Sequence, residues 1–440
     1  MAEPATHLLD AVWEYPLFQA LYGRRSRRFG LGFSLVEGPY RFKSQHAPVP
    51  LSEVEEAVLV AAGIGFSGSA FWEQSRPFPY RAGEGRTFPS TSHGRYTALF
   101  FTNDRGVFVI DPAAPPAAKT RTVEDASERE GVIDLYRQHR KTLQQGRLDF
   151  PRKVPSLSGH NLWDSNMPGS TLFMPVCDVS RAVIGMIAQF VDRRLERFTA
   201  KGSRGSYIVD DRFNCRPAGT REWVKNGFLD AEKLLPLSVL ERQACYYMFA
   251  EPAIICQNMF LATEALGIGG WMHCGFTSHG VFEALKFRIV KPSSASSLAN
   301  PIGFDGVFQA HCPPYFPTMD AAVDAALAPL LRRSQIESEP PLMSGPVPHL
   351  ISDTEYREGT VDISDEGIAC TKSVCNYIYE TYGRFPGSLD AMHLMWFMQA
   401  HHLDLDFYDK FFRPGSCGRT HASHMRTWHP RTADEAAGID

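Results

Sequence analysis

The feature that most constrains the fold is a long helical pattern in the middle of the chain, at residues 238–267. Its apolar and small residues recur at helical spacing, Ser238 and Glu241 have the spacing of a capping box, and Pro252 predicts a kink. The most apolar part, residues 250–276, still contains two glutamates, a glutamine and an asparagine, which is too polar for a membrane span. We therefore expect a buried helix whose small residues let another backbone pack closely.

The amino-acid composition limits the classes of protein to which this chain can belong. The 440 residues are 44% hydrophobic and 21% charged, which supplies enough apolar material for one large domain or two smaller ones. A net charge of −4 argues against a nucleic-acid partner, which would need a basic face. The nine cysteines form no CxxC pair and the N-terminus has no apolar segment of signal length, so we expect reduced thiols, a cytoplasmic location and no membrane partner.

Short-range signals predict the first elements of the fold. Apolar residues at helical spacing predict a helix over residues 1–23. Residues 52–63 begin with a capping box, Ser52 with Glu55, and carry an apolar stripe that ends at glycines, so they predict a second helix. Residues 97–110 contain two β-prone apolar runs around an Asn-Asp-Arg-Gly turn, which predicts a hairpin.

The same signals predict the remaining elements and the domain organisation. The expected elements are a Pro-rich linker at 112–120, an exposed helix at 124–145, a loop at 146–170, a strand at 170–179, and helices at 180–201, 320–333, 365–383 and 389–412. A second Pro-rich stretch at 336–350 predicts a linker between a domain of residues 1–335 and a mainly helical extension of residues 351–440. Strands and helices do not alternate regularly, so we predict an α+β fold.

A basic run, RRSRRF at residues 24–29, is the first candidate binding site. Four arginines within five residues repel one another unless an anion or nearby acids neutralise them. Guanidinium groups bind phosphate through paired hydrogen bonds, and Ser26 adds a hydroxyl. The competing interpretation is a solvated basic patch at the end of a helix, where cations are favoured.

Two further segments combine small polar residues with glycines. The loop PSTSHG at residues 89–94 can present donors to a polar ring edge, although such loops more often satisfy their own turns. The segment ATEALGIGGWMHCGF at residues 262–276 exposes backbone N–H groups at its glycines. His273 and Cys274 are neighbours on an extended chain and point to opposite faces, so we do not expect a Cys–His nucleophile. We expect Cys370 and Cys375 to be packing residues of a helix, without a chemical role.

The C-terminal region is rich in histidine and aspartate. His402 and Asp406 are four residues apart, and so on one face of a helix, as a metal pair would require, and His421 and His424 could add ligands. The spacing matches no zinc motif, so we predict no metal and keep a metal-dependent enzyme as a minor alternative.

Together, these segments resemble the flavin-dependent nitroreductase superfamily, and most closely its azoline dehydrogenase branch of the SagB/McbC type. The resemblance rests on four elements in the same order: RRSRRF at 24–29, PLSEVEE at 50–56, RTFPSTSHGRYTALFF at 86–101 with RGVFVIDP at 105–112, and ATEALGIGG with CGF at 262–276. It covers about residues 8–310 and leaves the rest of the chain unexplained.

The resemblance implies an FMN-binding α+β sandwich with a mainly antiparallel central sheet, usually a homodimer with flavin at the interface. The implied cofactor-binding residues are Arg24, Arg25, Ser26 and Arg28 for phosphate and flavin oxygens, Pro89, Ser90, Ser92 and His93 along the ring, and His273, Cys274 and Gly275 near flavin N5. Arg288 and Lys291 are the nearest candidates for the family's late phosphate-binding cation. The implied activity is an oxidoreductase in which reduced nicotinamide or a small organic substrate gives hydride to flavin N5.

Several residues depart from the family's pattern. His93 and Gly94 stand where the family has Gly-Ala, and Thr97 and Leu99 replace its Pro and Glu. We find no counterpart of the Lys–Tyr pair of azoline oxidation, so that reaction is not favoured over other flavin chemistry. The alternative function is a redox-inactive binding protein of the same fold, whose tail covers the flavin cavity.

Overall fold

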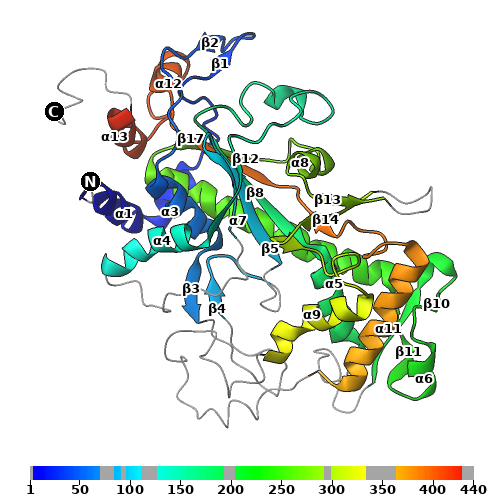
Figure 1. The fold of residues 1–440 in the computed structure, drawn as a ribbon. Helices are drawn as coiled ribbons and strands as arrows, with labels where there is room; N and C mark the ends of the chain where they lie inside the picture. The colour runs from blue at the N-terminus through cyan, green and yellow to red at the C-terminus, as the bar shows by residue number, and fades with distance from the viewer. Residues whose placement is uncertain are drawn as a thin grey trace.

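A computed structural model describes residues 3–69, 84–90, 96–110, 126–192, 204–291, 299–332 and 363–428. Over these residues the fold is α+β, and its main sheet is antiparallel throughout (Figure 1). The strand order is β12 (Gly269–His273), β17 (Phe397–His401), β8 (Thr171–Asp178), β5 (Thr97–Thr102), β6 (Gly106–Ile110) and β7 (Arg140–Gln145), with β16 (Met392–His393) also paired to β8. The α+β class and the antiparallel sheet are confirmed.

Both faces of this sheet are covered, which explains why its central strands are apolar throughout. Successive side chains of a strand point to opposite faces, and in β5 Leu99 and Phe101 join one core cluster while Ala98 and Phe100 join the other. The elements of the first cluster are α1 (Glu3–Trp13), α3 (Glu53–Ile64), α4 (Ala126–His139) and the second half of α7 (Leu237–Leu266).

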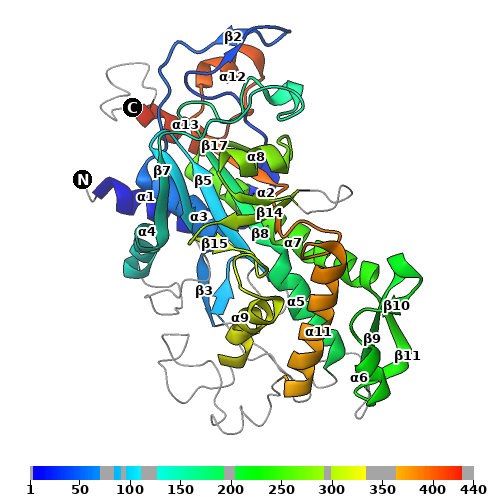
Figure 2. The ribbon, with the colours of Figure 1, turned by 45° about the vertical axis from the view of Figure 1, so that its right-hand side comes forward.

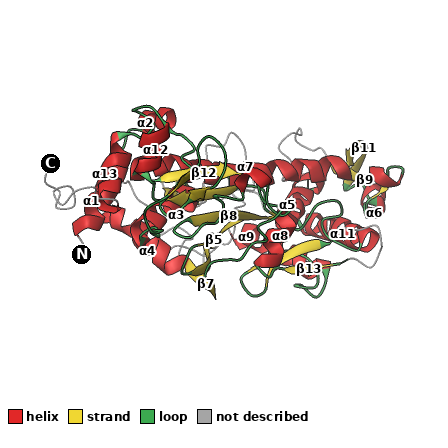
Figure 3. Ribbon diagram, turned by 90° about the horizontal axis from the view of Figure 1, so that it is seen from above, coloured by secondary structure: helices red, strands yellow, loops and turns green. Residues whose placement is uncertain are grey.

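The second cluster lies on the opposite face. Its helices are α5 (Val179–Val191), α8 (Ser278–Ala284), α9 (Met319–Arg332), α11 (Asp365–Tyr382) and the first half of α7. It also includes the small sheet β13 (Arg288–Val290), β14 (Asn300–Phe304) and β15 (Phe308–Gln309). Figure 2 shows α5, α9 and α11 side by side. In Figure 3, α7 runs along the length of the molecule, so this one helix contributes to both clusters.

The remaining elements lie at the edges of this core. They are α2 (Leu17–Gly23), β1 (Ser34–Leu35), β2 (Phe42–Lys43), β3 (Phe66–Ser69), β4 (Glu84–Arg86), β9 (Gly205–Asp210), β10 (Arg216–Pro217), α6 (Arg221–Lys225), β11 (Leu229–Pro236), α12 (Leu405–Phe411), α13 (Arg419–Trp428) and the 3-10 turns η2 (Gly159–Asn161) and η3 (Asp211–Phe213). A third apolar cluster joins residues 29–33 to α12 and α13, so the two ends of the chain pack together.

Several local predictions are confirmed. The capping box of α3 is present, with Ser52 and Glu55 each bound to the other's backbone N–H. The predicted hairpin is β5–β6, and the predicted strand at 170–179 is β8. Cys370 and Cys375 are fully buried in α11. The linkers predicted at 112–120 and 336–350 lie outside the described residues.

Other local predictions are wrong at their boundaries. The helix predicted over residues 1–23 is two helices, because Pro16 lies between α1 and α2. The helix predicted at 124–145 ends at His139, and the residues after it form β7 because their backbone pairs with β6. The expected capping box of α7 is absent: the N–H and hydroxyl of Ser238 bind Asp211, and the helix begins directly after Pro236.

The C-terminal region is mainly helical over its described residues, as predicted, but one of its expected helices is wrong. Residues 389–412, expected as one helix, contain β16 and β17, and only α12 is helical. All five residues of β17 are buried, and the strand lies between β12 and β8 in the main sheet. Its apolar residues face both core clusters, which a one-sided amphipathic helix cannot do. The C-terminal region is therefore part of the main core rather than a separate unit.

Candidate functional site

The basic run lies directly after α2, and its four arginines have different environments. The guanidinium carbon of Arg24 lies 4.8 Å from the centre of the Phe260 ring. Arg25 is exposed and donates from one guanidinium nitrogen to the carbonyls of Tyr22 and Arg24, at 2.9 and 2.8 Å. Ser26 is exposed. This outer part of the run, which the sequence predicted to bind phosphate, therefore remains accessible to an anion.

Arg27 is buried and has a structural role. One guanidinium nitrogen lies 2.6 Å from the carboxylate of Glu264 on α7, and Nε donates to the carbonyl of Ser416 at 2.9 Å. The two side chains are 6% and 3% exposed, so water does not screen the pair. Arg27 therefore joins the basic run to α7 and to the C-terminal region.

Arg28 connects the basic run to the end of β12. Its Nε donates to Asp164 at 2.5 Å, another nitrogen donates to Asn161 at 2.9 Å, and its guanidinium carbon lies 4.1 Å from the centre of the Trp271 ring. Burial raises the pKa of Asp164 to about 6, although Arg28 opposes this shift. The loop 146–170 has no periodic pattern, so no sequence signal marked Asn161 or Asp164.

His273 ends β12 in an apolar and aromatic environment. Its ring stacks on Trp271, with the ring centres 4.0 Å apart, and on Phe397, at 5.4 Å. Burial lowers the pKa of His273 to about 3, so the ring is neutral near pH 7. Nδ1 accepts the N–H of Gly275 at 3.1 Å, so the proton resides on Nε2.

Three buried polar atoms near Arg28 have no hydrogen-bond partner among the residues that the structure describes. They are Nε2 of His273, Nε1 of Trp271 and Oδ1 of Asp164. The first two are N–H donors and the third is an acceptor. A buried polar atom without a partner costs about 1–3 kcal/mol, so a polar ligand or water bound here would stabilise the protein.

Cys274 and Gly275 follow the strand. The thiol of Cys274 is free and exposed, whereas His273 is buried, so the two side chains do not form a nucleophile pair. A Cβ on Gly275 would lie 2.2 Å from Nδ2 of Asn161. Because residue 275 is glycine, the side-chain amide of Asn161 can lie directly against its backbone.

Ser90, from the start of the predicted ring-binding loop, lies against a different part of α7 from the basic run. Ser90 donates to Glu251 in α7, and the same buried carboxylate accepts from Thr97 at 2.8 Å and from the N–H of Tyr96 at 3.1 Å. Pro89 is exposed, and the predicted residues Ser92 and His93 lie outside the described residues. Glu251 and Glu264 are thirteen positions apart on α7, about 20 Å along the helix axis. One chain therefore does not bring Ser90 to the basic run.

Arg288, the predicted phosphate-binding cation late in the chain, also lies apart from the basic run. It is exposed on β13, in the small sheet, with its guanidinium carbon 5.5 Å from the centre of the Tyr315 ring. The predicted site residues thus fall into three groups: the basic run with the end of β12, the Ser90 loop at Glu251, and Arg288.

The C-terminal region covers part of the basic run. The N–H of Leu31 donates to the carbonyl of His402 at 3.0 Å, and the N–H of Phe29 donates to the hydroxyl of Tyr408 at 3.1 Å. Gly30 lies against His401, where a Cβ would be 2.7 Å from Cδ2 of that ring. Sequence reasoning missed this contact because the two segments lie near opposite ends of the chain.

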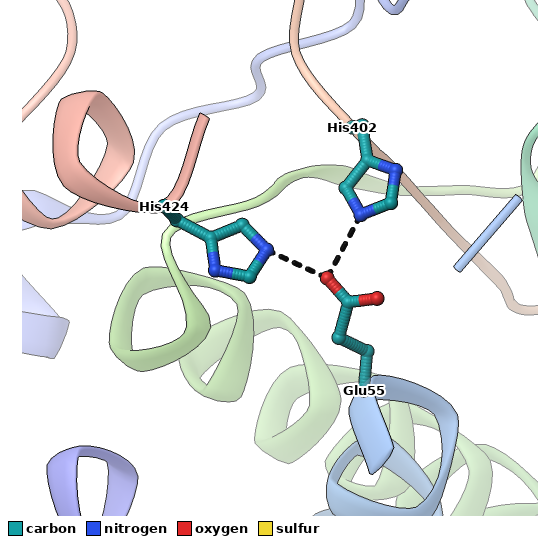
Figure 4. Close-up of side chains that lie close together, drawn as sticks. All are labelled: Glu55, His402 and His424. Atoms are coloured by element: carbon teal, nitrogen blue, oxygen red, sulfur yellow. Dashed lines mark hydrogen bonds and ion pairs between the residues drawn. The ribbon is translucent and has the colours of Figure 1, made fainter. Parts of the chain in front are cut away.

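Two His–acid groups lie in this region. His402 does not pair with Asp406, as the sequence suggested. Its Nε2 lies 2.8 Å from Oε1 of Glu55, and Nε2 of His424 lies 2.7 Å from the same oxygen (Figure 4). Asp406 instead faces His46 at 3.2 Å.

The Asp406 group resembles a helix cap more than a metal site. Asp404, its third member, uses Oδ1 to accept the N–H groups of Asp406 and Phe407 at the start of α12. The Glu55 group is more deeply buried and receives its members from three separate segments.

A comparison of the sequence with models of known protein families found no match, and a comparison with curated proteins found no significant one. Among the described residues, no helix is both long and apolar enough to cross a bilayer.

Proposed function

We propose that this protein is an FMN-dependent oxidoreductase that works as a homodimer. The observation that carries the proposal is the contact of Arg28 with Trp271. It places the basic run against the end of β12, beside His273 and Asp164. These two segments lie far apart in the sequence, and the resemblance assigned both to one flavin site.

The residues of this region fit FMN in part. Arg24 and Arg25 lie at the surface of the basic run and have the chemistry to bind the phosphate. The unpaired donors of His273 and Trp271 and the unpaired acceptor of Asp164 suit a ring edge that carries two carbonyls and one N–H, as the flavin pyrimidine does. Arg27 does not fit, because Glu264 already neutralises it.

FMN, when bound, supplies hydride and single-electron transfer. The chain's own residues hold and shield it. Asp164 and Asn161 fix the guanidinium of Arg28, which offers a positive charge to a developing negative charge on a ligand. His273 stays neutral because of its lowered pKa and so donates a hydrogen bond without adding charge. The indole rings of Trp163 and Trp271, both stacked with Arg28, exclude water.

The position of Ser90 supports a site built from two copies of the chain. Its carboxylate partner Glu251 lies about 20 Å from Glu264 along α7, so Ser90 of one chain does not reach the basic run of the same chain. We expect the Ser90 loop of one copy to complete the site formed by Arg24 and Arg28 of the other.

FMN binding can be measured by the quenching of flavin fluorescence during titration with the full-length protein. We expect wild-type protein to bind FMN and Arg24→Ala to bind at least tenfold more weakly, because a charge-assisted contact to phosphate contributes about 1.5–3 kcal/mol. The matched control is Arg41→Ala, since Arg41 is an exposed arginine that lies outside the basic run. Wild-type protein that does not bind FMN would contradict the proposal.

Mixed dimers test the two-copy arrangement. Chains carrying Arg24→Ala and chains carrying Ser90→Ala are unfolded and refolded together. If each site uses Arg24 of one copy and Ser90 of the other, random pairing restores about a quarter of the sites. If both residues come from one copy, mixing restores none.

A second candidate function is a redox-inactive binding protein. It is favoured by the C-terminal region, which lies on residues 29–33, and by the neutralisation of Arg27 and Arg28 within the chain. Folded protein that dimerises but binds neither FMN nor reduced nicotinamide would favour this function.

A further inference from the structure

Glu55, His402 and His424 converge on one point from three separate parts of the chain. Glu55 lies in the first turn of α3, His402 directly follows β17, and His424 lies on α13 (Figure 4). Their three ligand atoms lie within 4.8 Å of one another. Glu55 and His402 are 0% and 1% exposed, and the side chain of His424 is 13% exposed.

The hydrogen-bond donors and acceptors around His402 indicate that a proton or a metal cation lies between this side chain and that of Glu55. Nδ1 of His402 is 3.0 Å from the carbonyl oxygen of Val49, which can only accept, so this nitrogen carries the proton. In a neutral ring, Nε2 then presents a lone pair to the carboxylate of Glu55, which also has only lone pairs. Two acceptors at 2.8 Å repel unless a second proton or a metal ion separates them.

Glu55 is held in a way that leaves one oxygen available. Its Oε2 accepts the N–H of Ser52 at 2.6 Å in the capping box, so only Oε1 faces the two histidines. Nε2 of His424 points to this same oxygen. One divalent cation at this point would satisfy Oε1 and both ring nitrogens together, whereas protons alone would require either a buried imidazolium or a protonated Glu55.

The hydrogen bond from His402 to the carbonyl of Val49 is also typical of a histidine that binds a metal. Histidines that bind a metal usually donate their other N–H to a carbonyl or carboxylate, which fixes the ring and its tautomer. The carbonyl of Val49 occupies that position. Two histidines and one glutamate are also a ligand set that zinc uses in proteins.

We propose that Glu55, His402 and His424 bind a zinc ion. Zinc bonds of about 2.0–2.1 Å in tetrahedral geometry place ligand atoms roughly 3.3 Å apart, so the site must open by about half an ångström. His424 is the partly exposed member and lies on α13, the last helix of the described residues, so it can move most easily. The described residues supply three ligands, which leaves a fourth position for water.

Zinc at this site would fasten α13 and the end of β17 to the start of α3. Because the carbonyl of His402 also binds Leu31, the ion would hold the C-terminal region against the segment that follows the basic run. This inference is independent of FMN binding and rests on different residues.

Zinc content provides the test. Full-length protein is produced with added zinc, desalted, and analysed for metal. We expect about one zinc per chain in the wild type, and loss of zinc in Glu55→Gln and His424→Gln. The His46→Ala variant is the matched control, since His46 belongs to the other His–acid group, and it should keep its zinc.

Two measurements on the wild type keep the test independent of how the variants fold. We expect a chelator to lower Tm and re-added zinc to restore it, because a ligand that binds only the folded state stabilises it. Cobalt added to the metal-free protein should give visible absorption typical of four-coordinate cobalt. Wild-type protein without bound zinc, without cobalt absorption and with a Tm insensitive to the chelator would overturn the proposal in favour of hydrogen bonds made by protons alone. Zinc lost from His46→Ala but kept by His424→Gln would also overturn it.

Discussion

The arginines of the basic run should separate into structural and binding residues when each is replaced. Arg27→Met removes a guanidinium whose nitrogen lies 2.6 Å from Glu264 and leaves that carboxylate in a pocket where it is 3% exposed. The only other hydrogen bond to Glu264 in the described structure comes from the N–H of Arg25, at 3.4 Å. The imidazole of His421 lies 3.8 Å from the other oxygen of Glu264, but burial lowers the pKa of His421 to about 3, so this ring brings no charge near pH 7. The variant therefore contains a buried carboxylate without a cationic partner among these described contacts.

The expected loss of stability follows from this environment. Breaking a buried ion pair by removing one partner costs about 3–5 kcal/mol, and the hydrogen bond to the carbonyl of Ser416 adds about 1 kcal/mol. Replacing both partners with apolar residues, as in Arg27→Met/Glu264→Leu, removes the stranded charge. We expect this double variant to lie within about 2 kcal/mol of the wild type.

Urea denaturation of the four proteins in this double-mutant cycle measures the coupling directly. We expect a coupling energy of about 2 kcal/mol or more. Arg24→Ala is the comparison from the same run, and it should change stability by less than about 1 kcal/mol because Arg24 has no ion pair among the described residues. Equal destabilisation by Arg27→Met and Arg24→Ala, or additive effects in the cycle, would refute the distinction between the two arginines.

Two further predictions concern the residues around Arg28. The pKa of Asp164 is about 6 in the folded state against an ordinary 3.8, so the folded protein holds this proton more tightly and loses stability as pH rises through 4–6. Relative to Asp164→Asn, which does not titrate, wild type should lose about 2 kcal/mol between pH 4 and 7, and a pH-independent difference would contradict this. Gly275→Ala would place a Cβ 2.2 Å from Asn161 and should lower the free energy of unfolding, measured by urea denaturation, by about 1–3 kcal/mol. Adding Asn161→Ala should largely recover this stability. No recovery would show that the clash lies elsewhere.

Local signals in the sequence predicted much of the fold. The capping box at Ser52, the hairpin at residues 97–110 and the long helix at residues 238–267 depend on neighbouring residues, and all three are present. These local signals led to wrong predictions where contacts between distant segments determine the secondary structure. β17 was predicted as helix because its apolar residues continue a helical pattern, yet backbone pairing with β12 and β8 makes it a buried strand.

The candidate site was predictable only in part for the same reason. The charge of the basic run was visible in the sequence, but its division into half-buried Arg24, exposed Arg25 and buried Arg27 depends on Glu264 and on Ser416 of the C-terminal region. The Glu55 group is a similar case, because its members are hundreds of positions apart and only the fold brings them together. No short motif contains such information.

The most direct test of the central proposal is the absorption spectrum of purified full-length protein between about 300 and 550 nm, recorded before and after incubation with FMN and removal of free flavin. The proposal predicts bound-flavin absorption near about 450 nm in the wild type and its loss in Arg24→Ala but not in Arg41→Ala. Folded wild-type protein that stays colourless after incubation with FMN would contradict the proposed function.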